Sequence, residues 1–94
     1  MNSTDLDEAV WTGDLAKVKT LLDRGADVNA KTDFGQNVLM TASGKGNPEA
    51  VQALLDKGAD VNVRDCNGAR ALDVATVKGH AQVKDLLEQA NAKT

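Results

Sequence analysis

Apolar side chains recur at intervals of three and four along residues 13–25, GDLAKVKTLLDRG. The apolar positions are Leu15, Val18, Leu21 and Leu22. This spacing predicts an amphipathic helix whose apolar stripe faces a core. Asp14 stands where an N-cap side chain accepts backbone N–H bonds, and Gly25 stands where a helix ends in the left-handed conformation.

The same pattern returns along the chain at a fixed interval. The motif GADVN occupies residues 25–29 and again residues 58–62, and we call the interval from Gly25 to Gly58 the repeat period. The second copy has its own N-cap candidate, Asn47, followed by Pro48 at the first helical position, where the missing N–H costs nothing. A repeat period of about 33 residues predicts a solenoid, in which each unit buries its apolar face against its neighbours.

A shorter helix is predicted before each amphipathic one, at about residues 4–11, 37–44 and 70–77. Each short helix carries one leucine that we expect to face inward, namely Leu6, Leu39 and Leu72. Residues 32–35 and 65–68 end in Gly and suit a type I turn at a projecting tip. We therefore expect an all-α repeat, a single domain over residues 1–94. Its three helix-turn-helix units, at about residues 4–36, 37–69 and 70–94, are joined by projecting β-hairpin-like loops.

The polar residues of the GADVN motif have a predicted structural role. They are Asp27 and Asn29 in the first copy and Asp60 and Asn62 in the second. Asp and Asn side chains bind nearby backbone in turns, so we expect all four to hold the loop after the helix.

This combination of GADVN motifs, paired helices and Gly-ending tips resembles the ankyrin repeat family, in particular its short bacterial members. The resemblance covers nearly the whole chain. Where the family has T-P-L-H, this chain has NVLM at residues 37–40 and RALD at residues 70–73. The Thr–His bond between neighbouring repeats that the family implies is therefore absent, and we expect lower stability. The stretch from His80 to Leu86 spans six residues, against seven from Asn47 to Leu54, so the last helix is expected to start or turn differently.

Both ends of the chain are more polar than its middle. The first helix has Asp5, Asp7 and Glu8 at the positions of Val38, Met40 and Thr41. The last helix has Lys84, Asp85, Glu88 and Gln89 on its predicted outer side. Solenoids need polar terminal units, so we expect the first and last units to act as caps. The alternative, a piece of a larger ankyrin-repeat protein, stays open.

Charge and composition limit the class of molecule that the chain is expected to bind. The net charge is −3, which argues against nucleic acid and favours another protein with a basic or apolar patch. No segment has the length and apolar character of a signal or membrane-spanning sequence, so we expect a cytoplasmic protein without membrane contact. The single Cys66 has no partner within the chain. We expect a monomer, with a dimer through Cys66 or swapped units as the alternative.

The sequence contains no set of residues typical of a catalytic or metal site. One His and one Cys are too few for a zinc cluster. Residues 43–46, SGKG, lack the upstream Gly and the following Ser or Thr of a phosphate loop. We therefore expect that the protein is not an enzyme and binds no cofactor or metal. The alternative that stays open is a catalytic site composed of residues from this chain and from a partner. His80 is expected to cap a helix or lie at the surface.

The resemblance implies where a partner binds: on a concave strip made of the loop tips and the exposed ends of the first helices. The matching tip residues are Lys31, Asp33, Phe34, Gln36, Arg64, Cys66, Asn67 and Ala69. The matching helix residues are Trp11, Thr12, Gly44, Lys45, Val77 and Lys78. Trp11 and Phe34 are the candidate anchors, because an exposed aromatic ring buries a large area on binding. Alternatively, Trp11 covers the edge of the first unit and Phe34 packs on a neighbouring tip.

Two functional hypotheses follow from the resemblance. In the first, the chain is a non-catalytic interaction module that acts as an inhibitor, scaffold or adaptor. In the second, it is a substrate of an asparaginyl hydroxylase. The acceptors would be Asn29 and Asn62, which have Leu21 and Leu54 eight residues upstream.

Overall fold

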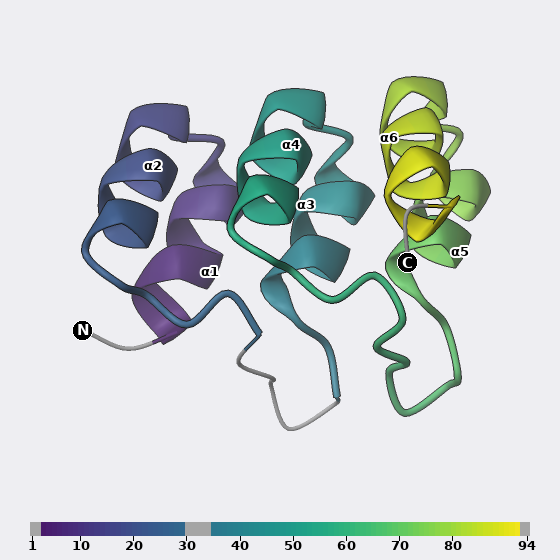
Figure 1. Cartoon of the computed structure of the whole chain (residues 1–94). Coiled ribbons are helices and arrows are strands. Elements are labelled where there is room, and N and C mark those ends of the chain that lie inside the picture. Colours follow the sequence, from purple (N-terminus) through teal and green to yellow (C-terminus); the bar gives the residue numbers. More distant parts are fainter. Residues whose placement is uncertain (1–2, 30–34, 93–94) are drawn as a thin grey trace.

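The computed structural model describes residues 3–29 and 35–92, and six helices lie within these ranges (Figure 1). They are α1 (Ser3–Thr12), α2 (Leu15–Asp23), α3 (Val38–Lys45), α4 (Pro48–Asp56), α5 (Ala71–Lys78) and α6 (Ala81–Ala92). The described part of the chain has no strand. The three short helices match the predicted ranges to within one residue at each end, which confirms the expected all-α repeat.

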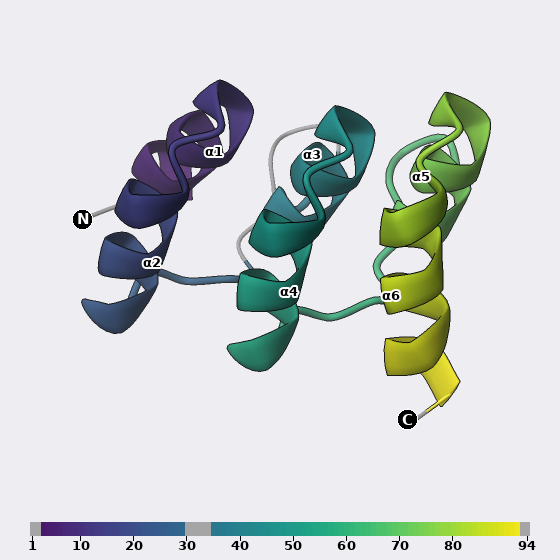
Figure 2. The same ribbon diagram turned by 90° about the horizontal axis from the view of Figure 1, so that it is seen from above.

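The helices form two layers. The first helices of the three pairs, α1, α3 and α5, lie side by side, and the second helices, α2, α4 and α6, form the other layer (Figures 1 and 2). The middle pair contacts the pairs on both sides, since α3 packs against α1 and α5 while α4 packs against α2 and α6. The connection after α4 projects from one end of this stack.

The predicted helix caps are confirmed. The side chain of Asp14 accepts a hydrogen bond from the Lys17 N–H (3.1 Å). Asn47 does the same for the Ala50 N–H (3.3 Å). Gly25 lies just beyond the end of α2 with φ near +90°, a conformation that residues with a Cβ rarely adopt. The caps define both ends of these helices locally, so their limits follow from the sequence.

The core runs between the two layers. The most deeply buried leucines are Leu6, Leu39, Leu54 and Leu87. The small residues Ala9, Ala42 and Ala75 of the first helices are also buried, so these helices approach closely. Leu72, expected to face inward, is only partly buried and packs against the edge of the core.

The expectation of an altered last helix is wrong. Helix α6 begins at Ala81, one repeat period after Pro48 at the start of α4, so the two helices start in the same register. Leu87 is 1 % exposed and occupies the position of the buried Leu54, whereas Leu86 is only partly buried. The comparison of the repeats within the sequence paired Leu54 with Leu86, whereas the structural equivalent of Leu54 is Leu87.

The polar N-terminal face also differs from the expectation. Asp7 does not lie on the outer side of α1: its carboxylate accepts a hydrogen bond of 2.8 Å from the Thr41 hydroxyl on α3. Glu8 is exposed. Successive helix positions face different neighbours, so one of the acidic residues joins the first two units instead of capping the stack.

His80 links two units and is not simply a surface residue. One of its ring nitrogens lies 3.2 Å from the carbonyl oxygen of Gly44, at the end of the preceding α3, and the side chain is partly buried. A Cβ added to Gly46 would lie 2.5 Å from this ring. Although the family's Thr–His bond is absent, neighbouring units are still joined by polar contacts of this kind.

Three of the four polar side chains of the GADVN motifs hold the loops as predicted, whereas the Asn62 side chain makes no hydrogen bond to the described residues. The Asp27 carboxylate accepts a hydrogen bond from the Asn29 N–H, and Asp60 accepts one from the Asn62 N–H. Asn29 also reaches the second copy: its side-chain oxygen accepts a bond from the Asp60 N–H (2.9 Å), and its amide donates to the Gly58 carbonyl (3.3 Å). The motif therefore stabilises each loop and joins consecutive loops.

Candidate functional site

A groove of about 370 Å³ crosses the layer of first helices. Its lining residues are Trp11, Gln36, Met40, Thr41, Gly44, Lys45, Val74 and Lys78. They come from α1, α3, α5 and the segment before α3, so the groove extends over all three units. We call it the first-helix groove.

Trp11 is the main apolar group of this groove. It is 61 % exposed, one of two large apolar side chains in the described residues that lie mainly in solvent. Lys45 Nζ lies 4.0 Å from the centroid of the indole ring, a cation–π contact. Gly44 stands one repeat period after Trp11, and a Cβ added to it would lie 3.3 Å from Val74 Cγ1. The indole ring is therefore largely exposed while it contacts Lys45.

The charged residues that line the groove are both cationic. They are Lys45 and Lys78, which stand in the last turns of α3 and α5. A cation in this place is favourable for the helix itself, because the C-terminal end carries partial negative charge. The groove therefore has the opposite sign to the chain, whose net charge is −3.

The structure brings together part of the predicted binding set. Trp11, Gln36, Gly44, Lys45 and Lys78 all line the first-helix groove. Met40, Thr41 and Val74 also line it but were not predicted. Met40 precedes Gly44 by four residues, and Thr41 and Val74 precede the two lysines by the same interval, so the helical spacing was the signal that could have identified them.

Two predicted helix residues lie outside the lining. Val77 is 83 % exposed on α5, so its side chain lies mainly in solvent. The Thr12 hydroxyl donates a hydrogen bond to the Ala9 carbonyl of its own helix.

The predicted tip residues of the second connecting loop do not line the groove. Arg64, Cys66, Asn67 and Ala69 surround a turn in which the Gly68 N–H donates to the Asp65 carbonyl (2.9 Å). The Asp65 carboxylate accepts hydrogen bonds from the N–H groups of Asn67 and Ala69, which fixes this tip. Cys66 is exposed there.

The first connecting loop reaches the second. A Cβ added to Gly35 would lie 3.3 Å from the Asp65 Cα, so the end of the first loop packs on the second tip. The predicted residues Lys31, Asp33 and Phe34 lie outside the described residues.

Other kinds of site have little support in the described ranges. Residues 3–29 and 35–92 contain no group of three or more His, Cys, Asp or Glu side chains arranged to hold a metal ion. No helix in the same ranges is long and apolar enough to span a membrane.

Comparison with known proteins gives a family match. A family model described as ankyrin repeats, in three copies, matches residues 6–94. A search among curated proteins finds no match. The matched range begins within α1 and includes the other five helices, so it takes in the whole of the groove.

Proposed function

Since this chain belongs to the ankyrin repeat family, whose members are generally non-catalytic protein-interaction modules, we propose that it binds a partner protein through its concave face. By concave face we mean the layer of α1, α3 and α5 together with the connecting loops. The bound chain acts as an inhibitor, scaffold or adaptor for that partner.

The observation that carries this proposal is the exposed Trp11 in a groove that spans three units. Aromatic residues at the centre of an interface are enriched among those whose loss costs most binding energy. The Lys45 contact holds the ring in place, which lowers the entropy lost when a partner covers it.

The sign of the groove charge refines the expected partner. The net charge of the chain predicts a basic or apolar surface, but Lys45 and Lys78 favour a segment with acidic and apolar side chains. Complementary charges speed association and reject wrong partners. We therefore propose that an acidic, apolar segment enters the first-helix groove.

A pull-down from the lysate of the source cells tests this proposal. The bait proteins are the wild type, the Trp11→Ala, Lys78→Glu double variant, and a control, Lys17→Glu, which reverses one exposed charge on α2. Mass spectrometry should find proteins retained by the wild type and the control and lost with the double variant. Retention by all three baits would contradict the proposed site.

A second proposal concerns modification of the GADVN asparagines, and Asn62 is the better acceptor. Both Asn29 and Asn62 are exposed. The Asn29 side chain makes two hydrogen bonds to the following loop, whereas Asn62 makes none through its side chain to the described residues. Peptide mass spectrometry of protein from its native host should show an added oxygen on Asn62. Unmodified Asn62 would rule this proposal out.

A further inference from the structure

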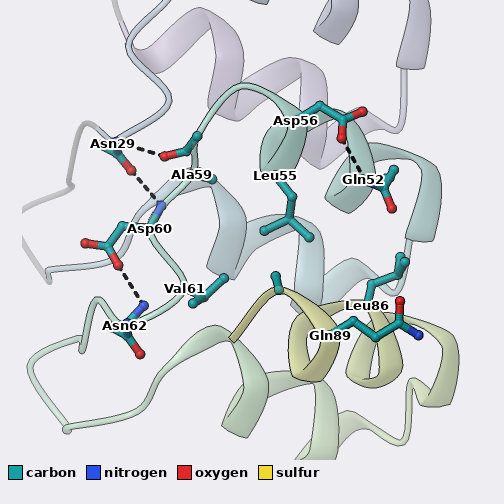
Figure 3. A pocket seen from close by; sticks show the side chains of 12 residues that line it. Asn29, Gln52, Leu55, Asp56, Ala59, Asp60, Val61, Asn62, Leu86 and Gln89 are labelled. Atoms are coloured by element: carbon teal, nitrogen blue, oxygen red, sulfur yellow. Dashed lines mark hydrogen bonds between the residues drawn. The ribbon is translucent and has the colours of Figure 1, made fainter. Parts of the chain in front are cut away.

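Two further grooves are lined by neighbouring second helices, and the second of them is also lined by residues of the connecting loops. The α2–α4 groove has a volume of about 390 Å³. The α4–α6 groove, shown in Figure 3, has about 560 Å³. Because the chain repeats with a fixed period, most positions that line the first groove have a counterpart in the second. We therefore compare the charged residues at equivalent positions of the two grooves, because their charges decide which side chains each groove attracts.

An ion pair lies across the α2–α4 groove. Lys57 Nζ stands 3.5 Å from a carboxylate oxygen of Asp23, so the end of α4 supplies a cation to the acid on α2. Both residues line this groove. The chain itself therefore supplies a cation to Asp23; the same groove is also lined by Lys19, Glu49 and Asp56, and Asp56 lines both grooves.

The α4–α6 groove has the acid without the cation. Asp56 stands at the position of Asp23, but Ala90 stands at that of Lys57. Asp56 accepts a hydrogen bond of 2.8 Å from Gln52 on its own helix (Figure 3), and it forms no ion pair with any described residue. The described residues that line this groove include a second acid, Asp60, and no Lys, Arg or His.

Part of the lining is apolar, beside the polar side chains of Asn29, Gln52, Asn62 and Gln89. Leu55 of α4 and Leu86 of α6 are both partly buried, and Val61 closes the side next to the loop. A lysine side chain fits both the unpaired acid and the apolar side chains of this groove. Its four-carbon stem packs on apolar surface while its ammonium group reaches an acid. The Lys57–Asp23 contact shows the same pairing within the chain.

We propose that the α4–α6 groove binds a lysine side chain presented by a basic segment of a partner protein. The ammonium group pairs with Asp56, and the stem lies against Leu55 and Leu86. This site is separate from the first-helix groove, and it takes a segment of opposite charge. A basic segment also suits the net charge of the chain, which is −3.

Two variants exchange the presence of a cation between the two grooves. Ala90→Lys places a cation opposite Asp56 and should close the α4–α6 groove. Lys57→Ala removes the cation opposite Asp23 and should open the α2–α4 groove. The probe is the peptide acetyl-Leu-Lys-Leu-amide, and two control peptides have norleucine or glutamate in place of lysine. Binding is followed by amide chemical shifts of the ¹⁵N-labelled full chain.

The wild type should show saturable shifts at Asp56, Leu86 and Ala90 with the lysine peptide only. Ala90→Lys should weaken this binding at least about tenfold. Lys57→Ala should add a second set of shifts around Asp23. Asp56→Asn is nearly the same size as the native residue and should also lose binding, which keeps the test decisive if Ala90→Lys fails to fold. Equal binding of the norleucine peptide, or unchanged binding by the folded variants, would overturn the proposal.

Discussion

Replacement of Gly46 by alanine tests the contact between His80 and the preceding unit. Gly46 ends α3 with φ near +72°, and an added Cβ would lie 2.5 Å from two atoms of the His80 ring. Gly79 ends α5 in nearly the same conformation, φ near +76°, but nothing lies within 4 Å of its added Cβ. The two positions are equivalent in consecutive repeats, so Gly79 provides a matched control.

The expected loss of stability has two parts. Either alanine must adopt a left-handed conformation, which costs about 1–2 kcal/mol. At Gly46 the ring must also move, which forfeits its bond to Gly44, about 1 kcal/mol, and adds crowding of about 1–3 kcal/mol. We therefore expect about 1–2 kcal/mol for Gly79→Ala and about 3–6 kcal/mol for Gly46→Ala.

Urea unfolding followed by circular dichroism measures both values, and each variant is repeated in a His80→Ala background. Without the ring, the two glycine positions should cost the same to within about 0.5 kcal/mol, the limit expected for independent sites. Equal costs in the native background would refute the contact. An excess at Gly46 that persists without His80 would refute the assignment of the cost to the ring.

Three further predictions concern stability and use the same unfolding assay. Leu39→Ala should cost about 2–5 kcal/mol, because the side chain is fully buried at the centre of the stack; a cost below about 1 kcal/mol would contradict that burial. Asn29→Ala should cost about 0.5–1.5 kcal/mol, since it removes the exposed hydrogen bond to the Asp60 N–H, and amide hydrogen exchange at Asp60 should speed up; unchanged exchange would exclude the bond. Asp14→Ala should cost about 0.5–2 kcal/mol through the lost cap of α2, whereas Asp14→Asn should retain most of the stability.

The sequence predicts the helices well because their limits are local. Asp14 and Asn47 bind backbone groups three residues ahead, and the glycines end the helices through their own conformation. The repeat period then places the units in order. Which of two adjacent residues faces the next unit depends on packing, and so Asp7 and the pair Leu86 and Leu87 were misplaced.

The candidate site was only partly predictable for a related reason. The period identifies Trp11, Lys45 and Lys78 as equivalent ends of the first helices, and these three do line one groove. The positions one turn earlier, such as Thr41 and Val74, line it as well because the neighbouring first helices pack side by side. The sign of the charge in the groove depends on the side chains that line it, so it cannot be inferred from the net charge of the chain.

Photo-crosslinking in the source cells tests the proposed concave binding face most directly. A photoreactive phenylalanine analogue replaces Trp11, or Val77, or, as a control, Lys17, which is exposed on α2. The account predicts a crosslinked partner from the Trp11 and Val77 positions and none from Lys17. A partner crosslinked only from Lys17 would contradict the assignment of binding to the concave face.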